Sequence, residues 1–193
     1  QALCDGNLPV AEITFRTAAA EESIRRITAE CPDVLVGAGT VLTKEQADRA
    51  VAAGAKFIVT PGFNPEMIAY IKSLGIPMMP GAATPGEMEQ AMSMGLTNIK
   101  FFPAEANGGV NKLKALAGPY QAAKWMPTGG VNAKNLNDYL LFDRIIACGG
   151  TWLATGADIA ENNWDGITKK CKEAIKVMLG FELKKICIYG DSA

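Results

Sequence analysis

The chain of 193 residues has the composition of an ordinary globular domain, with 49% hydrophobic residues, 20% charged residues and a net charge of −1. The near-neutral charge argues against a nucleic-acid-binding protein, because there is no surplus of Lys and Arg to neutralise phosphates. No apolar run is long enough to span a bilayer and the first residues show no signal-peptide pattern, so we expect a cytoplasmic protein without membrane contact.

The chain contains no histidine, which excludes Ser-His-Asp and Cys-His catalytic pairs and any metal site with histidine ligands. General acid–base chemistry must therefore fall to carboxylates, lysines or tyrosines. The five cysteines are odd in number and widely spaced, with no C-x-x-C pair, which predicts reduced thiols instead of disulfides or a zinc site.

Short β-rich runs alternate along the chain with amphipathic segments and turn signals. This alternation predicts a parallel sheet covered by helices. The predicted strands are residues 9–14, 34–37, 56–60, 77–79, 98–101, 124–127 and 144–148. The predicted helices are residues 18–30, 43–53, 65–73, 84–94, 110–116 and 133–140, with a last helix over 164–178 after a loop near Asp158.

Two closures of such a sheet compete, an open doubly wound sheet and a closed TIM (β/α)8 barrel. No G-x-G-x-x-G loop follows the first strand, which weakens the dinucleotide-binding version of the open sheet. Glycine-rich turns instead follow several strands, as at 37–40, 128–130 and 149–151. Turns of that kind at the carboxyl ends of many strands favour a barrel whose active face is a ring of loops.

The pattern contains seven β/α units, whereas a complete barrel has eight. Residues 1–6 have the pattern of the end of a helix whose preceding strand is missing. We therefore expect a barrel domain over residues 1–180 and a strand-like tail over 181–193. The tail either fills the vacant first-strand position, as in a circular permutant, or begins another module of a chain truncated at its start.

The first predicted strand carries charge on one face. Side chains alternate along a strand, so Glu12, Thr14 and Arg16 share a face. Ile13 and Phe15 lie on the other face, which meets the helices in a barrel, so that Glu12 points toward the barrel axis. A buried carboxylate needs a partner. Taken alone, a structural Glu–Arg pair or a solvent-facing side explains this strand equally well.

Lys100 lies in the segment 98–103, on the face opposite Ile99 and Phe101. Lysine is rarely buried without a reason. In an apolar environment near another cation the pKa of a lysine falls, which leaves a neutral amine able to attack a ketone. Arg16 is the candidate cation and Glu12 the candidate proton carrier. The alternative is that Lys100 only pairs with a structural glutamate.

Two glycine-rich segments late in the chain, 127–131 and 148–152, follow the strands that would be seventh and eighth in a barrel. Glycines there let backbone N–H groups converge on an anion, and the threonine hydroxyls add donors. A tight turn would explain either segment alone, whereas the two together at this spacing predict a phosphate site.

These segments resemble the 2-keto-3-deoxy-6-phosphogluconate (KDPG) aldolase and 4-hydroxy-2-oxoglutarate (KHG) aldolase family. The resemblance runs in order from about Ala2 to Leu179. It departs from the family in the missing first strand, in the tail after Leu183, and at Thr151, where many members have serine. The matching motifs are EITFR at 12–16, GAGTV at 37–41, TPG at 60–62, KFFPAE at 100–105, PTGG at 127–130 and GGTW at 149–152.

The resemblance implies a class I, Schiff-base aldolase that needs no metal and no cofactor and is a homotrimer. Such an enzyme of the Entner–Doudoroff pathway cleaves 2-dehydro-3-deoxy-6-phosphogluconate to pyruvate and glyceraldehyde 3-phosphate, and members often cleave 4-hydroxy-2-oxoglutarate to pyruvate and glyoxylate. Its partners are therefore small keto acids and phosphosugars. A phosphosugar isomerase or epimerase on the same fold, with Glu12 as base, is the nearest rival, and an inactive fragment or assembly scaffold is a rival of another class.

The resemblance also assigns roles to residues. It makes Lys100 the Schiff-base lysine and Glu12 the general acid–base residue. It expects the substrate carboxylate at Arg16 and Thr40, the pyruvyl group against Pro61 and Phe102, and the phosphate at Thr128, Gly129, Gly130, Gly150 and Thr151.

Overall fold

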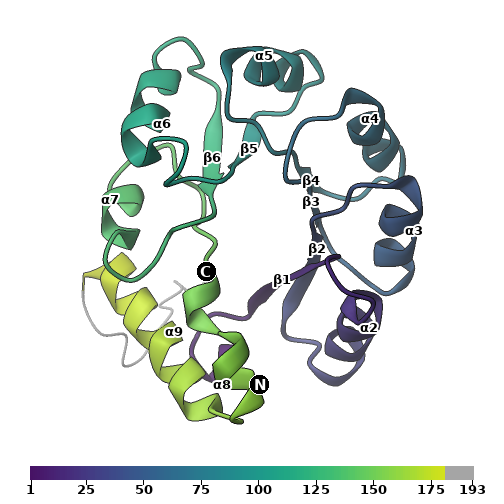
Figure 1. The fold of residues 1–193 in the computed structure, drawn as a ribbon, viewed down its shortest axis with the longest axis vertical. Helices are drawn as coiled ribbons and strands as arrows, with labels where there is room; N and C mark the ends of the chain where they lie inside the picture. Colours follow the sequence, from purple (N-terminus) through teal and green to yellow (C-terminus); the bar gives the residue numbers. More distant parts are fainter. Residues whose placement is uncertain (181–193) are drawn as a thin grey trace, which may run out of the picture.

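A computed structural model describes residues 1–180, and the tail expected over 181–193 lies outside the described residues. Figure 1 looks down a ring of strands with helices around its outside, which is the TIM-type α/β barrel arrangement. The ring begins with the parallel strands β1 (Val10–Thr14), β2 (Leu35–Gly39), β3 (Ile58–Val59) and β4 (Met78–Met79), paired in that order, and continues with β5 (Asn98–Phe101) and β6 (Lys124–Pro127).

Isolated bridges extend the ring beyond these two sheets. Gly81 after β4 bridges Lys100 in β5, which joins the first four strands to the next two. On the far side of β6, Ile145 bridges Trp125 and Gly149 bridges Thr128, so the predicted strand 144–148 occupies the next position without continuous strand pairing. The predicted barrel is therefore present from β1 to this seventh position.

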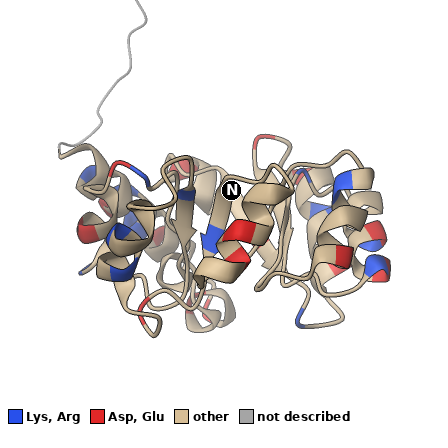
Figure 2. Ribbon diagram, turned by 90° about the horizontal axis from the view of Figure 1, so that it is seen from above, with Lys and Arg blue, Asp and Glu red and all other residues tan. Residues whose placement is uncertain are grey.

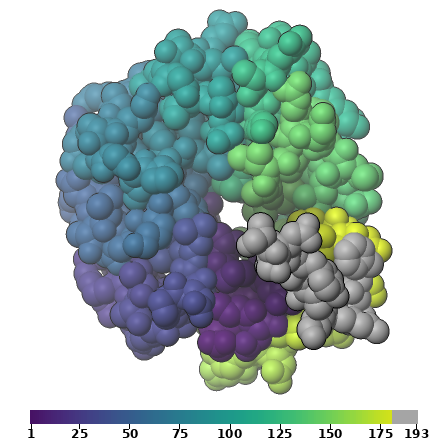
Figure 3. Space-filling model, turned by 180° about the vertical axis from the view of Figure 1, so that it is seen from behind, coloured from purple at the N-terminus to yellow at the C-terminus, as the bar shows by residue number. Residues whose placement is uncertain are grey.

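The ring is open between its two ends within the described residues. Among residues 1–180, β1 pairs with β2 along one of its edges and with no strand along the other edge. Figure 3 shows an opening through the middle of the molecule, bordered by purple residues near the N-terminus and green residues of the late loops. A further strand would have its place in the ring between residues 144–148 and β1. Whether the tail contributes a strand there stays a prediction outside the described residues.

The helices agree with the sequence pattern to within a few residues, and α4 has the predicted bounds because Asn64 caps it and Pro65 starts it. The short helix expected at the start is also present, as α1. The helices are α1 (Ala2–Asp5), α2 (Ala20–Glu30), α3 (Lys44–Ala52), α4 (Pro65–Ser73), α5 (Pro85–Ser93), α6 (Gly109–Ala117), α7 (Leu136–Leu140), α8 (Gly156–Ala160) and α9 (Trp164–Leu179), with a 3-10 turn η1 at Thr151–Leu153.

The loop predicted near Asp158 is wrong, because these residues form α8. Thr155 accepts a hydrogen bond from the Asp158 N–H, and the Asp158 carboxylate accepts one from the Thr155 N–H, which makes a capping box. The same carboxylate pairs with Lys170 on α9 at 2.6 Å. Contacts of this kind with α9 hold a five-residue helix that its own length would not stabilise.

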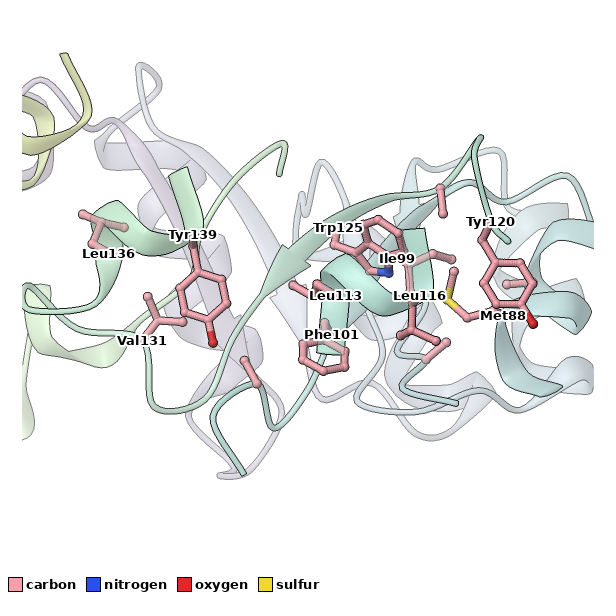
Figure 4. Packing of buried hydrophobic residues seen from close by; sticks show 14 residues of the cluster. Met88, Ile99, Phe101, Leu113, Leu116, Tyr120, Trp125, Val131, Leu136 and Tyr139 are labelled. Atoms are coloured by element: carbon pink, nitrogen blue, oxygen red, sulfur yellow. The ribbon is translucent and has the colours of Figure 1, made fainter. Parts of the chain in front are cut away.

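Two hydrophobic clusters fill the space between strands and helices. One packs Ile24, Val36, Ile58 and Ile71 beneath α2, α3 and α4. The other gathers residues of α5, α6, α7 and the strands β5 and β6 around Trp125, which is fully buried (Figure 4). Ile99 and Phe101 belong to this second cluster, so the apolar face of β5 meets the helices as predicted.

Charged residues of both signs are spread over the outer helices in the view of Figure 2. Several form ion pairs one turn apart, such as Arg26 with Glu30 and Arg25 with Glu21 on α2. In residues 1–180, no helix combines the length and the apolar character needed to cross a membrane.

Candidate functional site

Lys100 and Glu12 meet inside the ring of strands. The Nζ of Lys100 lies 3.2 Å from the Oε1 of Glu12, although the two residues are 88 positions apart in the sequence. The Lys100 side chain is 7% exposed and that of Glu12 is 24% exposed. The amine is thus nearly enclosed, and the carboxylate partly reaches solvent. This arrangement places a potential nucleophile beside a potential proton carrier.

The strands bring these two side chains together through their alternation. In β5, Lys100 stands between Ile99 and Phe101, which are both fully buried on the helix side. Its backbone is held by the neighbouring loop after β4, because the Lys100 N–H donates to the Pro80 carbonyl and its own carbonyl accepts from the Ala82 N–H. The side chain of Lys100 therefore has only the inner face of the ring to occupy.

Gly39 at the end of β2 makes room for the Glu12 side chain. A methyl group added to Gly39 would overlap the Oε1 of Glu12 and would lie 2.6 Å from its Cδ. Glycine is thus the residue that lets the carboxylate lie across β2 toward Lys100. Sequence reasoning included Gly39 in a motif but did not assign it this role, because the contact joins two different strands.

Arg16 and Thr40, the residues expected to bind the substrate carboxylate, lie just beyond the ends of β1 and β2. Arg16 is exposed, and its Nε donates to the Thr14 hydroxyl at 3.2 Å, so the guanidinium turns back along the face that carries Glu12. Thr40 has a positive φ of 55°, an unfavourable conformation for a β-branched residue that often occurs at functional sites.

Pro61 and Phe102, expected at the pyruvyl group, follow β3 and β5. Pro61 lines a cavity of about 280 Å³ together with Val41, Thr60 and Phe63. The Nζ of Lys100 lies 5.4 Å from the centroid of the Phe102 ring, within the range of a cation–π contact. The Phe102 ring is therefore next to the amine, and it is 41% exposed.

The two glycine-rich segments expected to bind phosphate are adjacent. The Gly149 N–H donates to the Pro127 carbonyl at 3.0 Å, and Gly149 bridges Thr128. Gly129 and Gly130 have φ values of 88° and 86°, which favour glycine. Gly150 and Thr151 follow at the start of η1. The two segments thus form one surface of turns at the carboxyl ends of neighbouring strand positions.

Thr128 carries an unused donor on this surface. Its residue is 9% exposed, and its hydroxyl has no hydrogen-bond partner within residues 1–180. A buried hydroxyl without a partner is costly, so a ligand that accepts from it would remove that cost.

Two further residues next to these turns were not identified from the sequence. Tyr139 on α7 donates its hydroxyl to the carboxylate of Glu105, which follows β5. Glu105 stands in the KFFPAE motif, whereas nothing in the local sequence marks Tyr139. Among residues 1–180, no group of three or more Cys, Asp or Glu side chains is placed to hold a metal ion.

Comparison with known proteins gives these observations a context. The family model described as KDPG and KHG aldolase matches residues 1–170. The 2-dehydro-3-deoxy-phosphogluconate aldolase of Haemophilus influenzae is 47% identical over 176 residues, which cover 91% of this chain and 83% of that protein. The enzyme of the same name from Treponema pallidum is 44% identical over 178 residues, covering 92% of this chain and 85% of that protein.

A solved structure agrees with these relatives. The KDPG aldolase of Legionella pneumophila, with pyruvate captured at low pH as a covalent carbinolamine intermediate, is similar with a TM-score of 0.85 and 39% identity. The match covers 88% of this chain and 82% of that one. The resemblance seen in the sequence motifs is thereby confirmed, and this chain belongs to the KDPG and KHG aldolase family.

Proposed function

We propose that this chain is a class I aldolase that cleaves 2-dehydro-3-deoxy-6-phosphogluconate to pyruvate and glyceraldehyde 3-phosphate through a Schiff base on Lys100. It also cleaves 4-hydroxy-2-oxoglutarate to pyruvate and glyoxylate. The single observation that carries the proposal is the enclosed Lys100 amine, with its Nζ 3.2 Å from the Oε1 of Glu12. The carbinolamine in the Legionella relative supports it, because a carbinolamine is the adduct of an amine with a ketone.

The first half of the reaction forms the iminium. The Lys100 amine attacks the C2 ketone of the substrate, and the resulting carbinolamine loses its hydroxyl group as water. Glu12 is close enough to Nζ to supply the proton that this leaving hydroxyl needs. The iminium that remains is an electron sink joined to C3 of the substrate.

The second half breaks the carbon–carbon bond. Glu12 takes the proton from the C4 hydroxyl while the C3–C4 bond breaks, and the bonding electrons move into the iminium to give an enamine. Glyceraldehyde 3-phosphate leaves, and Glu12 returns a proton to C3. Addition of water to the regenerated iminium then releases pyruvate and the free Lys100 amine.

The binding residues are proposed from their positions around this centre. Arg16 binds the substrate carboxylate bidentately with help from Thr40, and its guanidinium has no ion-pair partner within residues 1–180. Pro61 and Phe102 contact the pyruvyl carbons. The phosphate is bound by Thr128, Gly129, Gly130, Gly150 and Thr151.

Borohydride trapping tests the proposal. Incubation of the chain with pyruvate and borohydride, followed by peptide mass analysis, is expected to find a reduced pyruvyl adduct on Lys100. Lys100→Ala should remove the adduct. Lys44→Ala is the matched control, because Lys44 also pairs with a glutamate, Glu66 at 2.7 Å, but lies on the surface. Absence of the adduct from folded protein would refute the assignment, and an isomerase would give the same absence.

We propose a homotrimer, as the family resemblance implies, and light scattering during size-exclusion chromatography measures its mass. The cytoplasmic location stays a prediction, which fractionation of the producing cells would check.

A further inference from the structure

Tyr139 and Glu105 form a hydrogen-bonded pair that has no role in the proposed mechanism. The Tyr139 hydroxyl on α7 donates to the Glu105 carboxylate in the turn after β5. The Tyr139 residue is 1% exposed, whereas Glu105 is exposed. Figure 4 shows the Tyr139 ring beside Val131 and Leu136 at one end of the hydrophobic cluster. Burial, and after it the hydrogen bond to Glu105, raises the pKa of Tyr139, so its hydroxyl keeps its proton and stays a donor.

The turn that carries Glu105 is hydrogen-bonded to the first phosphate segment. The Ala104 N–H donates to the Thr128 carbonyl at 2.8 Å, and the Glu105 N–H donates to the Gly129 carbonyl at 3.1 Å. The pairing of β5 with β6 therefore continues beyond the carboxyl ends of both strands, into the segments that follow them. Any movement of Glu105 would be passed to Gly129 through these bonds.

The side chain of Glu105 also lies directly against Gly130. A methyl group added to Gly130 would lie 2.5 Å from the Cγ of Glu105 and 2.7 Å from its Cβ. On the other side of the carboxylate, a methyl group added to Gly109 would lie 3.2 Å from the Glu105 Oε1 and 3.4 Å from the Tyr139 hydroxyl oxygen. The Glu105 side chain thus fills the space between the phosphate segment and the start of α6.

We infer that Glu105 and Tyr139 are positioning residues that hold the segment Thr128–Gly130 in the conformation that binds the phosphate of the substrate. The inference rests on the proposed function. Tyr139 fixes the carboxylate from the core side, and Glu105 in turn supports Gly129 through its backbone and Gly130 through its side chain. Neither residue touches the substrate. Replacing either residue should therefore weaken binding of the substrate's phosphate group and leave the attack of Lys100 on the ketone unchanged.

Conservative substitutions can remove the hydrogen bond between Tyr139 and Glu105 and keep most of the packing around both side chains. Tyr139→Phe removes only the hydroxyl. Glu105→Asp keeps the charge but withdraws the carboxylate from Tyr139 by one methylene, and Glu105→Gln keeps an oxygen that accepts the same hydrogen bond. Tyr120→Phe is the matched control, because Tyr120 is a buried tyrosine that donates to Glu89 at 3.1 Å. Figure 4 shows it at the opposite end of the same cluster.

Two measurements separate positioning from folding. One is the KM and kcat for 2-dehydro-3-deoxy-6-phosphogluconate, and the other is borohydride trapping with pyruvate, which carries no phosphate. Tyr139→Phe and Glu105→Asp are each expected to raise KM about ten-fold, equivalent to roughly 1.4 kcal/mol of binding free energy. Trapping with pyruvate should stay at the wild-type level. Glu105→Gln should remain within about three-fold of the wild-type KM, and Tyr120→Phe should not change it.

Unchanged KM in both Tyr139→Phe and Glu105→Asp would overturn the inference, and so would a parallel fall in pyruvate trapping or an equal effect of Tyr120→Phe. If Tyr139→Phe does not fold, Glu105→Asp decides the question alone, because Glu105 is exposed and its replacement leaves the core intact. Failure of the wild-type chain to trap pyruvate is a separate result, which refutes the proposed function itself.

Discussion

Replacing Gly39 by alanine should disable the site without unfolding the protein. Gly39 does not have a positive φ, so alanine can adopt its backbone conformation. The added methyl group, however, would overlap the Glu12 carboxylate and lie 2.6 Å from its Cδ, where ordinary contacts are 3.4 Å or longer. The Glu12 side chain must therefore move by about 1 Å or rotate away from Lys100.

The displacement of the Glu12 carboxylate sets the expected loss of kcat. A displacement of about 1 Å in an active site can cost on the order of a hundred-fold in rate. General acid–base catalysis as a whole contributes roughly 10² to 10⁴-fold, which sets the upper limit if Glu12 is displaced completely. Stability should change little, because the atoms that must move are at the end of a flexible side chain with a 24% exposed surface.

The assay is steady-state release of pyruvate, combined with urea unfolding of the same samples. Gly39→Ala is expected to lower kcat on the order of a hundred-fold while the free energy of unfolding stays near the wild-type value. Gly86→Ala is the control, because nothing lies within 4 Å of a methyl group added there on α5. It should keep full activity. A folded Gly39→Ala protein with wild-type kcat would show that the position of Glu12 does not matter to the chemistry.

Three further predictions concern the rest of the molecule. Leu113→Ala should lower the free energy of unfolding by about 2–5 kcal/mol, measured by urea denaturation, because Leu113 is fully buried; a smaller loss would mean that the cluster closes around the cavity. The pKa of Asp158 is lowered in the folded protein, first by its hydrogen bond with Lys170, so this carboxylate stabilises the fold above its ordinary pKa and loses that effect as the pH falls. Urea midpoints between about pH 6 and pH 3 should therefore fall more steeply for the wild type than for Asp158→Asn, and equal slopes would contradict the prediction. Burial raises the pKa of the Cys148 thiol to about 12, so Cys148 should resist alkylation by iodoacetamide at neutral pH until the protein is unfolded; modification of the folded protein, located by peptide mass analysis, would contradict this.

Most elements could be predicted from the sequence because each depends on neighbouring residues. The bounds of β5 follow from alternation around Lys100, and those of α4 from the Asn64 cap and Pro65. The same local signals were present but unused at α8, where Thr155 and Asp158 form a capping box over a helix of five residues. The segment 144–148 was predicted to be a strand, but in the structure only isolated bridges at Ile145 and Gly149 connect this part of the chain to its neighbour.

The sequence by itself determined the alternation of strands and helices, the inward face of β5 and the turn-forming glycines, since periodicity and backbone preferences act over a few residues. Tertiary structure alone decided that the Lys100 amine lies 3.2 Å from the Glu12 carboxylate. It also decided that Gly39 makes room for Glu12 and that Tyr139 supports Glu105 beside Gly130. Contacts of this kind join residues from separate strands and helices, and only the curvature of the ring of strands brings such residues within hydrogen-bonding distance.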